Sequence, residues 1–146
     1  MNILQANKFI EHFTRWASTQ IDILAVALVG SYARNTARED SDVDLVIITE
    51  DPQKYFTHTA WTESFGIAAK QQIEDYGMLT SLRVWYESGL EVEYGFTTPA
   101  WAKTPLDEGT KEVIEGGLRI LFERAALLNF ISNAVVLKTR PEPGIT

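Results

Sequence analysis

The hydrophobic residues in the N-terminal part of the chain predict an amphipathic helix followed by two strands. Within residues 3–19, apolar side chains recur at the spacing of one helical face, at Phe9, Ile10, Phe13 and Trp16. Two apolar runs rich in β-branched residues, Ile23–Val29 and Asp42–Ile48, are typical of strands. Between these runs, residues 31–37 predict a short helix.

The middle of the chain predicts a β-hairpin after a segment without clear periodicity. Residues 53–75 carry aromatic side chains at irregular spacing, and we expect a helix over 55–65 that buries them in part. Two alternating, aromatic-rich runs, Met78–Glu87 and Leu90–Phe96, then flank Ser88-Gly89. This arrangement is typical of two antiparallel strands joined by a tight turn.

The C-terminal part predicts a helix over 110–115, a short strand over 118–122 and a closing helix over 125–138. Together the elements indicate an α/β (α+β) domain in which helices pack on a mixed sheet. Because no linker, internal repeat or low-complexity tract interrupts the chain, we expect a single domain over residues 1–139 with a tail over 140–146.

Composition and charge exclude several classes of function. The 146 residues carry a net charge of −7, with 20 acidic against 13 basic residues, and no cysteine. Proteins that follow a long nucleic acid usually carry a basic stripe, so we expect no DNA or RNA partner. The missing cysteines exclude disulfides and thiolate metal sites. No apolar run reaches the roughly 18 residues of a membrane span and no signal peptide is recognisable, so we expect a cytoplasmic protein.

One polar stretch points to a particular chemistry. Gly30 and Ser31 follow the first apolar run, and Asp42 and Asp44 begin the second. Because side chains alternate along a strand, the two aspartates project from the same face, where their charges repel unless a cation lies between them. Carboxylate oxygens favour Mg²⁺, which binds one or two such groups together with phosphate oxygens. A tight turn at Gly30 can present backbone N–H groups to a phosphate.

This stretch resembles the motif of the nucleotidyltransferase superfamily, which includes DNA polymerase β and the aminoglycoside and lincosamide nucleotidyltransferases. The family is recognised by a Gly-Ser turn followed by an Asp-x-Asp pair, and the matching residues here are Gly30, Ser31, Asp42 and Asp44. Arg34 matches the basic residue that often follows the turn and contacts triphosphate. Asn35 stands where many members carry Gly, a change that we expect to be tolerated because asparagine adopts left-handed backbone readily. The whole stretch looks like the small stand-alone bacterial members, and the resemblance implies the polymerase-β-type catalytic fold.

A third carboxylate is expected in the second strand of the hairpin. Polymerase-like chemistry usually needs one, because two metal ions require more ligands than one pair of aspartates offers. Glu91 and Glu93 share a face of this strand. Aminoglycoside-type relatives place an acid four residues after a turn glycine and between two hydrophobic residues, and by that resemblance Glu93 is the better match. Glu91, at the mouth of the strand, would then contact the substrate or support the metal-binding residues. In the alternative, both glutamates face solvent and have no role in the site.

The resemblance implies a Mg²⁺-dependent transfer of a nucleoside monophosphate, AMP from ATP, to a hydroxyl, with release of pyrophosphate. In this interpretation one or two Mg²⁺ ions are held by Asp42, Asp44 and Glu93, and the nucleotide is bound by Gly30, Ser31, Arg34 and Arg38. The alternative is a catalytically silent module that keeps the fold and binds a partner protein, as an antitoxin does.

The sequence leaves the acceptor open. An acidic chain suits a small, cationic acceptor and also a protein acceptor. Antibiotic-modifying relatives usually carry a further, mostly helical domain, for which this chain has little room. We therefore expect a homodimer or a hetero-complex to complete the acceptor pocket, since small stand-alone relatives often pair with a helical, toxin-like partner.

Overall fold

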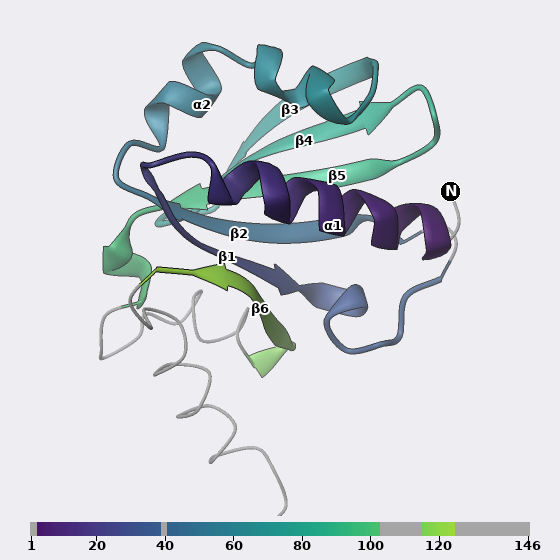
Figure 1. Cartoon of the computed structure of the whole chain (residues 1–146), viewed down its shortest axis with the longest axis horizontal. Coiled ribbons are helices and arrows are strands. Elements are labelled where there is room, and N and C mark those ends of the chain that lie inside the picture. The colour runs from purple at the N-terminus through teal and green to yellow at the C-terminus, as the bar shows by residue number, and fades with distance from the viewer. Residues whose placement is uncertain (1–2, 39–40, 103–114, 125–146) are drawn as a thin grey trace, which may run out of the picture.

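The protein is built around a six-stranded mixed sheet with the strand order β3-β4-β5-β2-β1-β6 (Figure 1). The computed structural model describes residues 3–38, 41–102 and 115–124. The strands are β1 (Ile23–Val29), β2 (Val43–Thr49), β3 (Ala68–Asp75), β4 (Thr80–Tyr86), β5 (Glu91–Thr97) and β6 (Leu118–Glu123). The pair β2–β5 is parallel, and the other neighbouring pairs are antiparallel.

One face of the sheet is covered by helical segments. They are the helices α1 (Ile3–Ser18) and α2 (Gln53–Thr57) and the 3₁₀ segment η2 (Ala60–Phe65), and Figure 1 shows α1 lying across the sheet. The apolar stripe of α1 packs onto every second residue of β2, β4 and β5. Its centre is aromatic: Phe13 and Tyr94 are both fully buried, with ring centroids 5.5 Å apart. The main core therefore lies between α1 and the sheet.

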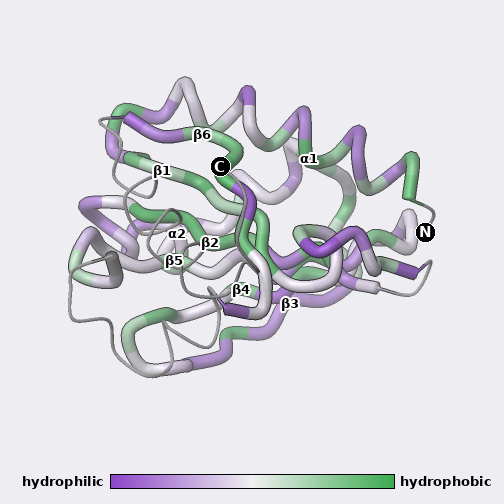
Figure 2. The backbone as a smooth tube through the Cα atoms, turned by 90° about the horizontal axis from the view of Figure 1, so that it is seen from below, coloured by the Kyte–Doolittle hydropathy of each residue, from purple (hydrophilic) through white to green (hydrophobic). Residues whose placement is uncertain are grey.

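The opposite face of the sheet differs from one half to the other. Over β1 and β2 it is apolar, and Val46 and Ile48 pack against Trp101 of the 3₁₀ segment η3 (Pro99–Ala102). Because side chains alternate along β2, Asp44 projects on this face together with Val46. Figure 2 shows hydrophobic residues along β1 and β2 but a mostly hydrophilic β3. The polar half of this face is the part that borders Asp44.

The predicted strands over 23–29, 42–48, 90–96 and 118–122 are confirmed, as are the hairpin and the first helix. Two predictions were wrong. The helix expected over 55–65 divides into α2 and η2, because His58 has extended backbone with φ −127°. The helix expected over 31–37 is only the 3₁₀ turn η1 (Gly30–Tyr32) followed by turns.

The strand β3 was not predicted at all. Three other predictions lie outside the described residues: the helix over 110–115 except for its last residue, the helix over 125–138, and the tail over 140–146. Among the helices that the structure describes, none combines the length and the apolar character needed to cross a bilayer. The fold class expected from the sequence, an α+β domain with helices on a mixed sheet, is confirmed.

Candidate functional site

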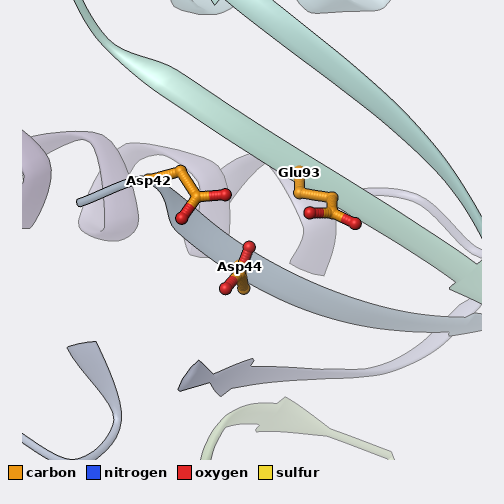
Figure 3. A group of neighbouring side chains, drawn as sticks. All are labelled: Asp42, Asp44 and Glu93. Atoms are coloured by element: carbon orange, nitrogen blue, oxygen red, sulfur yellow. The ribbon is translucent and has the colours of Figure 1, made fainter. Parts of the chain in front are cut away.

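Three carboxylates lie close together at the two central strands of the sheet, β2 and β5, on the face that carries Asp44. Asp42 lies directly before β2, Asp44 is in β2, and Glu93 is in β5. Asp44 and Glu93 are opposite each other in the parallel β2–β5 ladder. One carboxylate oxygen from each of the three residues lies within 4.8 Å of the others, and Figure 3 shows the three groups gathered around a common space. Backbone pairing thus brings together acids that are far apart in the sequence.

Asp44 is the most constrained of the three. Its Oδ1 atom is buried and has no hydrogen-bond partner among the described residues. Burial, together with the neighbouring carboxylates of Asp42 and Glu93, raises the pKa of Asp44 to about 8, against a smaller lowering by Arg83. A buried carboxylate oxygen without a donor is costly unless a cation or a proton satisfies it.

Gly30 allows the preceding turn to approach Asp44 closely. Its φ of 75° lies in the left-handed region, and a Cβ atom at this position would be 2.6 Å from Asp44 Oδ2. Both facts require glycine here. The expectation for Asn35 is confirmed, since its φ is 60°.

Arg83 of β4 ties the acidic residues of this region together, and the sequence interpretation had not singled it out. Its guanidinium lies 2.6 Å from Glu93 Oε2, 2.7 Å from Glu91 Oε2, 3.4 Å from Glu74 Oε1 and 3.7 Å from Asp42 Oδ2. Burial lowers the pKa of Arg83, but these carboxylates together raise it above its ordinary value. Arg83 therefore remains a cation and fixes the direction of the Glu93 carboxylate.

A signal for Arg83 was present in the hairpin. Residues that pair across a tight turn are symmetric about it, and the register centred on Ser88 places Arg83 opposite Glu93. Tyr32 was missed as well. Its hydroxyl is buried without a partner in the described part of the chain, and burial, together with the charge of Asp42, raises its pKa.

The other predicted site residues are placed around the triad at different distances from it. Ser31 is in η1, next to Gly30. Glu91 accepts a hydrogen bond from Arg83, as Glu93 does. Arg34 donates from its Nη1 to the carbonyl of Gly116 at 2.5 Å, and its side chain is packed against the turn before β6.

Arg38 is exposed in the loop before β2, where its backbone N–H donates to Ser41 Oγ at 2.8 Å. The structure thus gathers the three acids and places the Gly-Ser turn beside them. It does not bring Arg34 or Arg38 into a described contact with the acids.

The three acids fit a hard divalent cation. All of the donor atoms are carboxylate oxygens, which is the set that Mg²⁺ prefers. The unpartnered Oδ1 of Asp44 and the like charge of the group are the features that a cation would relieve. Arg83 supplies only part of the positive charge that would balance the three acids, because it also contacts Glu74 and Glu91.

Comparisons with known proteins agree with this geometry. Residues 8–96 match the family model described as a nucleotidyltransferase domain. No curated protein matches the chain. An aminoglycoside 6-adenyltransferase from Bacillus subtilis has a similar structure, with a TM-score of 0.53, 19% identity and coverage of 70% of this chain and 37% of that chain.

The polymerase core of TRAMP, an RNA surveillance complex, gives a TM-score of 0.50 and 18% identity, over 75% of this chain and 34% of that chain. The chain spans about a third of the length of these two structures, and likeness at such low identity shows a shared fold. A toxin–antitoxin structure with AMP-PNP aligns over 94% of this chain and 86% of that chain. Its TM-score of 0.40 and identity of 10% are too low to support a conclusion about fold or function.

Proposed function

Because the chain belongs to the nucleotidyltransferase domain family, we propose that it transfers a nucleoside monophosphate from a nucleoside triphosphate to an acceptor hydroxyl. The observation that carries this proposal is the convergence of Asp42, Asp44 and Glu93 next to the Gly30 turn. The acceptor oxygen forms a bond to the α-phosphorus, the bond from that phosphorus to the bridging oxygen breaks, and pyrophosphate leaves. The structural likeness to an adenyltransferase that acts on aminoglycosides supports AMP as the transferred group and a small molecule as acceptor; a partner protein is the other acceptor class.

The triad is the proposed metal site. Asp42, Asp44 and Glu93 would hold one or two Mg²⁺ ions, which neutralise triphosphate charge and lower the pKa of an acceptor hydroxyl when bound. Glu93 either completes this ligand set or accepts the proton of the attacking hydroxyl. In both roles the contact of 2.6 Å from Arg83 to Glu93 Oε2 keeps the carboxylate in one orientation.

Nucleotide binding is assigned to the turn and to the arginines that follow it. Gly30 and Ser31 begin a 3₁₀ turn whose backbone N–H groups suit phosphate oxygens. Arg34 would exchange its bond to the Gly116 carbonyl for a phosphate oxygen, which is a stronger, charge-assisted contact. Arg38, exposed in the same loop, would add charge at the rim of the site.

The proposal is tested by thermal unfolding with ATP, in the presence and absence of Mg²⁺. A ligand at about 100 times its dissociation constant stabilises a protein by roughly 2.7 kcal/mol, which is readily measured for a domain of this size. We expect a Mg²⁺-dependent rise in the unfolding temperature that is lost in Asp44→Asn and kept in Asp51→Asn, a matched change at an exposed aspartate. Pyrophosphate release with candidate acceptors then measures turnover.

No stabilisation by any of the four ribonucleoside triphosphates would contradict the proposal. It would favour the alternative of a silent module that binds a partner protein. The intact set of three acids supports the enzyme over that alternative, since a binding module has no need of an unpartnered, buried carboxylate oxygen.

A further inference from the structure

The strand β3 is an open edge of the sheet. Within the described residues it pairs on one side only, with β4. It is eight residues long, and all of its residues except Ala68 and Glu74 are exposed. An edge strand of this length presents a row of backbone N–H and C=O groups that another strand can bind.

Large apolar side chains gather along this edge. Ile73 is 57% exposed and Tyr76, directly after the strand, is 56% exposed. Ile67 and Met78, which flank the strand on the two sides, are exposed as well. Ile73 and Met78 also line a shallow cavity of about 250 Å³ beside α2. Exposed apolar residues that lie together, as Ile73 and Met78 do, are typical of interaction surfaces.

Two opposite charges are placed symmetrically about Gln72 within the regular part of β3. An irregularity between Ala68 and Lys70 interrupts the β3–β4 register, and the strand ends at Asp75. From Lys70 onward the pairing is regular, and Lys70 and Glu74 lie two residues before and two residues after Gln72, on the same face. The two charges are therefore of opposite sign and equidistant from the centre.

We propose that β3 pairs antiparallel with β3 of a second copy of this chain, with Gln72 on the two-fold axis. In that register Lys70 of each copy is opposite Glu74 of the other, which gives two cross-strand ion pairs for each dimer. Charged residues on an edge strand usually prevent association. Among the two-fold antiparallel registers of this strand, only the one centred on Gln72 places Lys70 opposite an acid. The opposite charges of Lys70 and Glu74 therefore favour a second copy of this chain as the partner.

The same register covers the exposed apolar residue of the strand. Ile73 lies on the helix-covered face, and across a two-fold axis at Gln72 the two Ile73 side chains are diagonal neighbours. On the other face, Lys70 keeps its place 4.8 Å from the centre of the Trp85 ring, and Glu74 keeps its contact with Arg83. The ion pair would therefore extend the charged group around Arg83 across the interface.

Cross-linking tests the register directly, because the chain contains no cysteine of its own. We expect Gln72→Cys to form a disulfide-linked dimer under mild oxidation, since a residue on the axis faces its own copy. Lys70→Cys alone should not cross-link, whereas a mixture of Lys70→Cys and Glu74→Cys should. Lys8→Cys, an exposed position on α1, is the control for random collisions. Cross-linking of Gln72→Cys no faster than Lys8→Cys would overturn the proposal.

Sedimentation across a concentration series measures the same contact without cysteine. Wild type should dimerise, and Lys70→Glu should raise the dimer dissociation constant by about tenfold or more, because each change acts twice in a dimer. The exchange Lys70→Glu with Glu74→Lys should restore it, while Lys8→Glu matches the charge change elsewhere and should leave it unaltered. A wild type that sediments only as a monomer, or a double exchange as weak as the single variant, would refute the pairing. None of these readouts depends on nucleotide, so they are independent of the proposed activity.

Discussion

The β1–β2 pair has an aspartate at each end, and the two carboxylates have opposite surroundings. Asp22, directly before β1, is surrounded by donors: it accepts hydrogen bonds of 2.7 Å from Thr49 Oγ1, Lys54 Nζ and Tyr55 Oη. Burial raises the pKa of Asp22, but these donors outweigh burial and the net pKa lies below its ordinary value. Asp44, opposite Val29 at the other end, has a buried oxygen without a partner and two like charges beside it.

The difference separates a carboxylate that stabilises the fold from one that is left available. At Asp22 one donor comes from β2 and two come from α2, which the carboxylate thereby ties to the sheet. These hydrogen bonds occupy the carboxylate in the folded protein. Asp44 has two other acids, Asp42 and Glu93, beside it in place of hydrogen-bond donors. This arrangement destabilises the folded protein when no ligand is bound. Strained or unsatisfied groups of this kind concentrate at functional sites.

The largest expected effect is on turnover. Asp44→Asn should lower the rate of nucleotidyl transfer by at least about a hundredfold, because it removes a proposed metal ligand. The same change should raise the free energy of unfolding of the metal-free protein at neutral pH by about 1 kcal/mol, because a carboxyl with a pKa raised to about 8 must take up a proton on folding and an amide need not. Asp22→Asn should leave the rate per folded molecule unaltered. Pyrophosphate release and urea unfolding measure the two quantities, and a less stable Asp44→Asn variant would contradict the comparison.

Crowding at the Asp44 end is tested by glycine substitution. Gly30→Ala should cost about 2–3 kcal/mol of stability, because it adds a clash with Asp44 to the strain of a positive φ. Gly77→Ala is the matched control: its φ is +85° and no atom lies within 4 Å of the added Cβ. It should cost only about 1 kcal/mol. Equal costs in urea unfolding would show that the approach of Gly30 to Asp44 is not tight.

The satisfied end is tested by Asp22→Asn, which should lower stability at neutral pH by about 2 kcal/mol through the loss of charge-assisted hydrogen bonds. The pKa of Asp22 is lower in the folded than in the unfolded state, so this contribution is present above the unfolded value, about 3.9. It is lost as the pH falls through the folded pKa. Unfolding curves of the variant and the wild type should therefore converge in acid, and a difference that persists at the lowest pH would have another cause.

The smallest effect is expected for Arg83→Gln. The guanidinium is partly solvent-accessible, so its loss should destabilise the metal-free protein by about 1 kcal/mol. Mg²⁺ should recover part of this loss, because it replaces the missing positive charge among the acids. Arg15→Gln, an exposed change on α1, should respond to neither condition. Thermal unfolding with and without Mg²⁺ distinguishes the cases; a loss that Mg²⁺ leaves unchanged would separate Arg83 from the proposed metal site.

Local sequence patterns predicted much of the fold. The strands β1 and β2 are continuous apolar runs, β5 begins with alternating polar and apolar residues, and α1 has a continuous apolar face. By contrast, β3 reads Ala-Ala-Lys-Gln-Gln-Ile-Glu-Asp and is held by backbone pairing with β4, so no alternation of apolar residues marks it. The helix over 55–65 was wrong because aromatic residues can fill a core from irregular backbone as well as from a helix.

In the candidate site, too, residues that are close in the sequence could be predicted, and contacts that depend on strand pairing could not. Asp42 and Asp44 were found because they are close in the sequence and share a strand. Glu93 was chosen over Glu91 by family resemblance. In the structure Arg83 binds both glutamates, but only the carboxylate of Glu93 lies with the two aspartates. Their catalytic roles stay predictions. The contact of Arg83 with Glu74 depends on β3, and no pattern short of the complete strand order would have revealed it.

The parallel pairing of β2 with β5 has a consequence for synthesis of the protein. Asp44 and Glu93 are adjacent in the sheet, but α2, β3 and β4 all lie between them in the chain. A nascent chain on the ribosome therefore holds only two of the three acids until β5 has emerged and docked beside β2. Such long-range pairing forms slowly, because a long loop must close before any contact rewards it. The three acids would then converge only when β5 pairs with β2, so the growing chain would gain the proposed cation site only at that step.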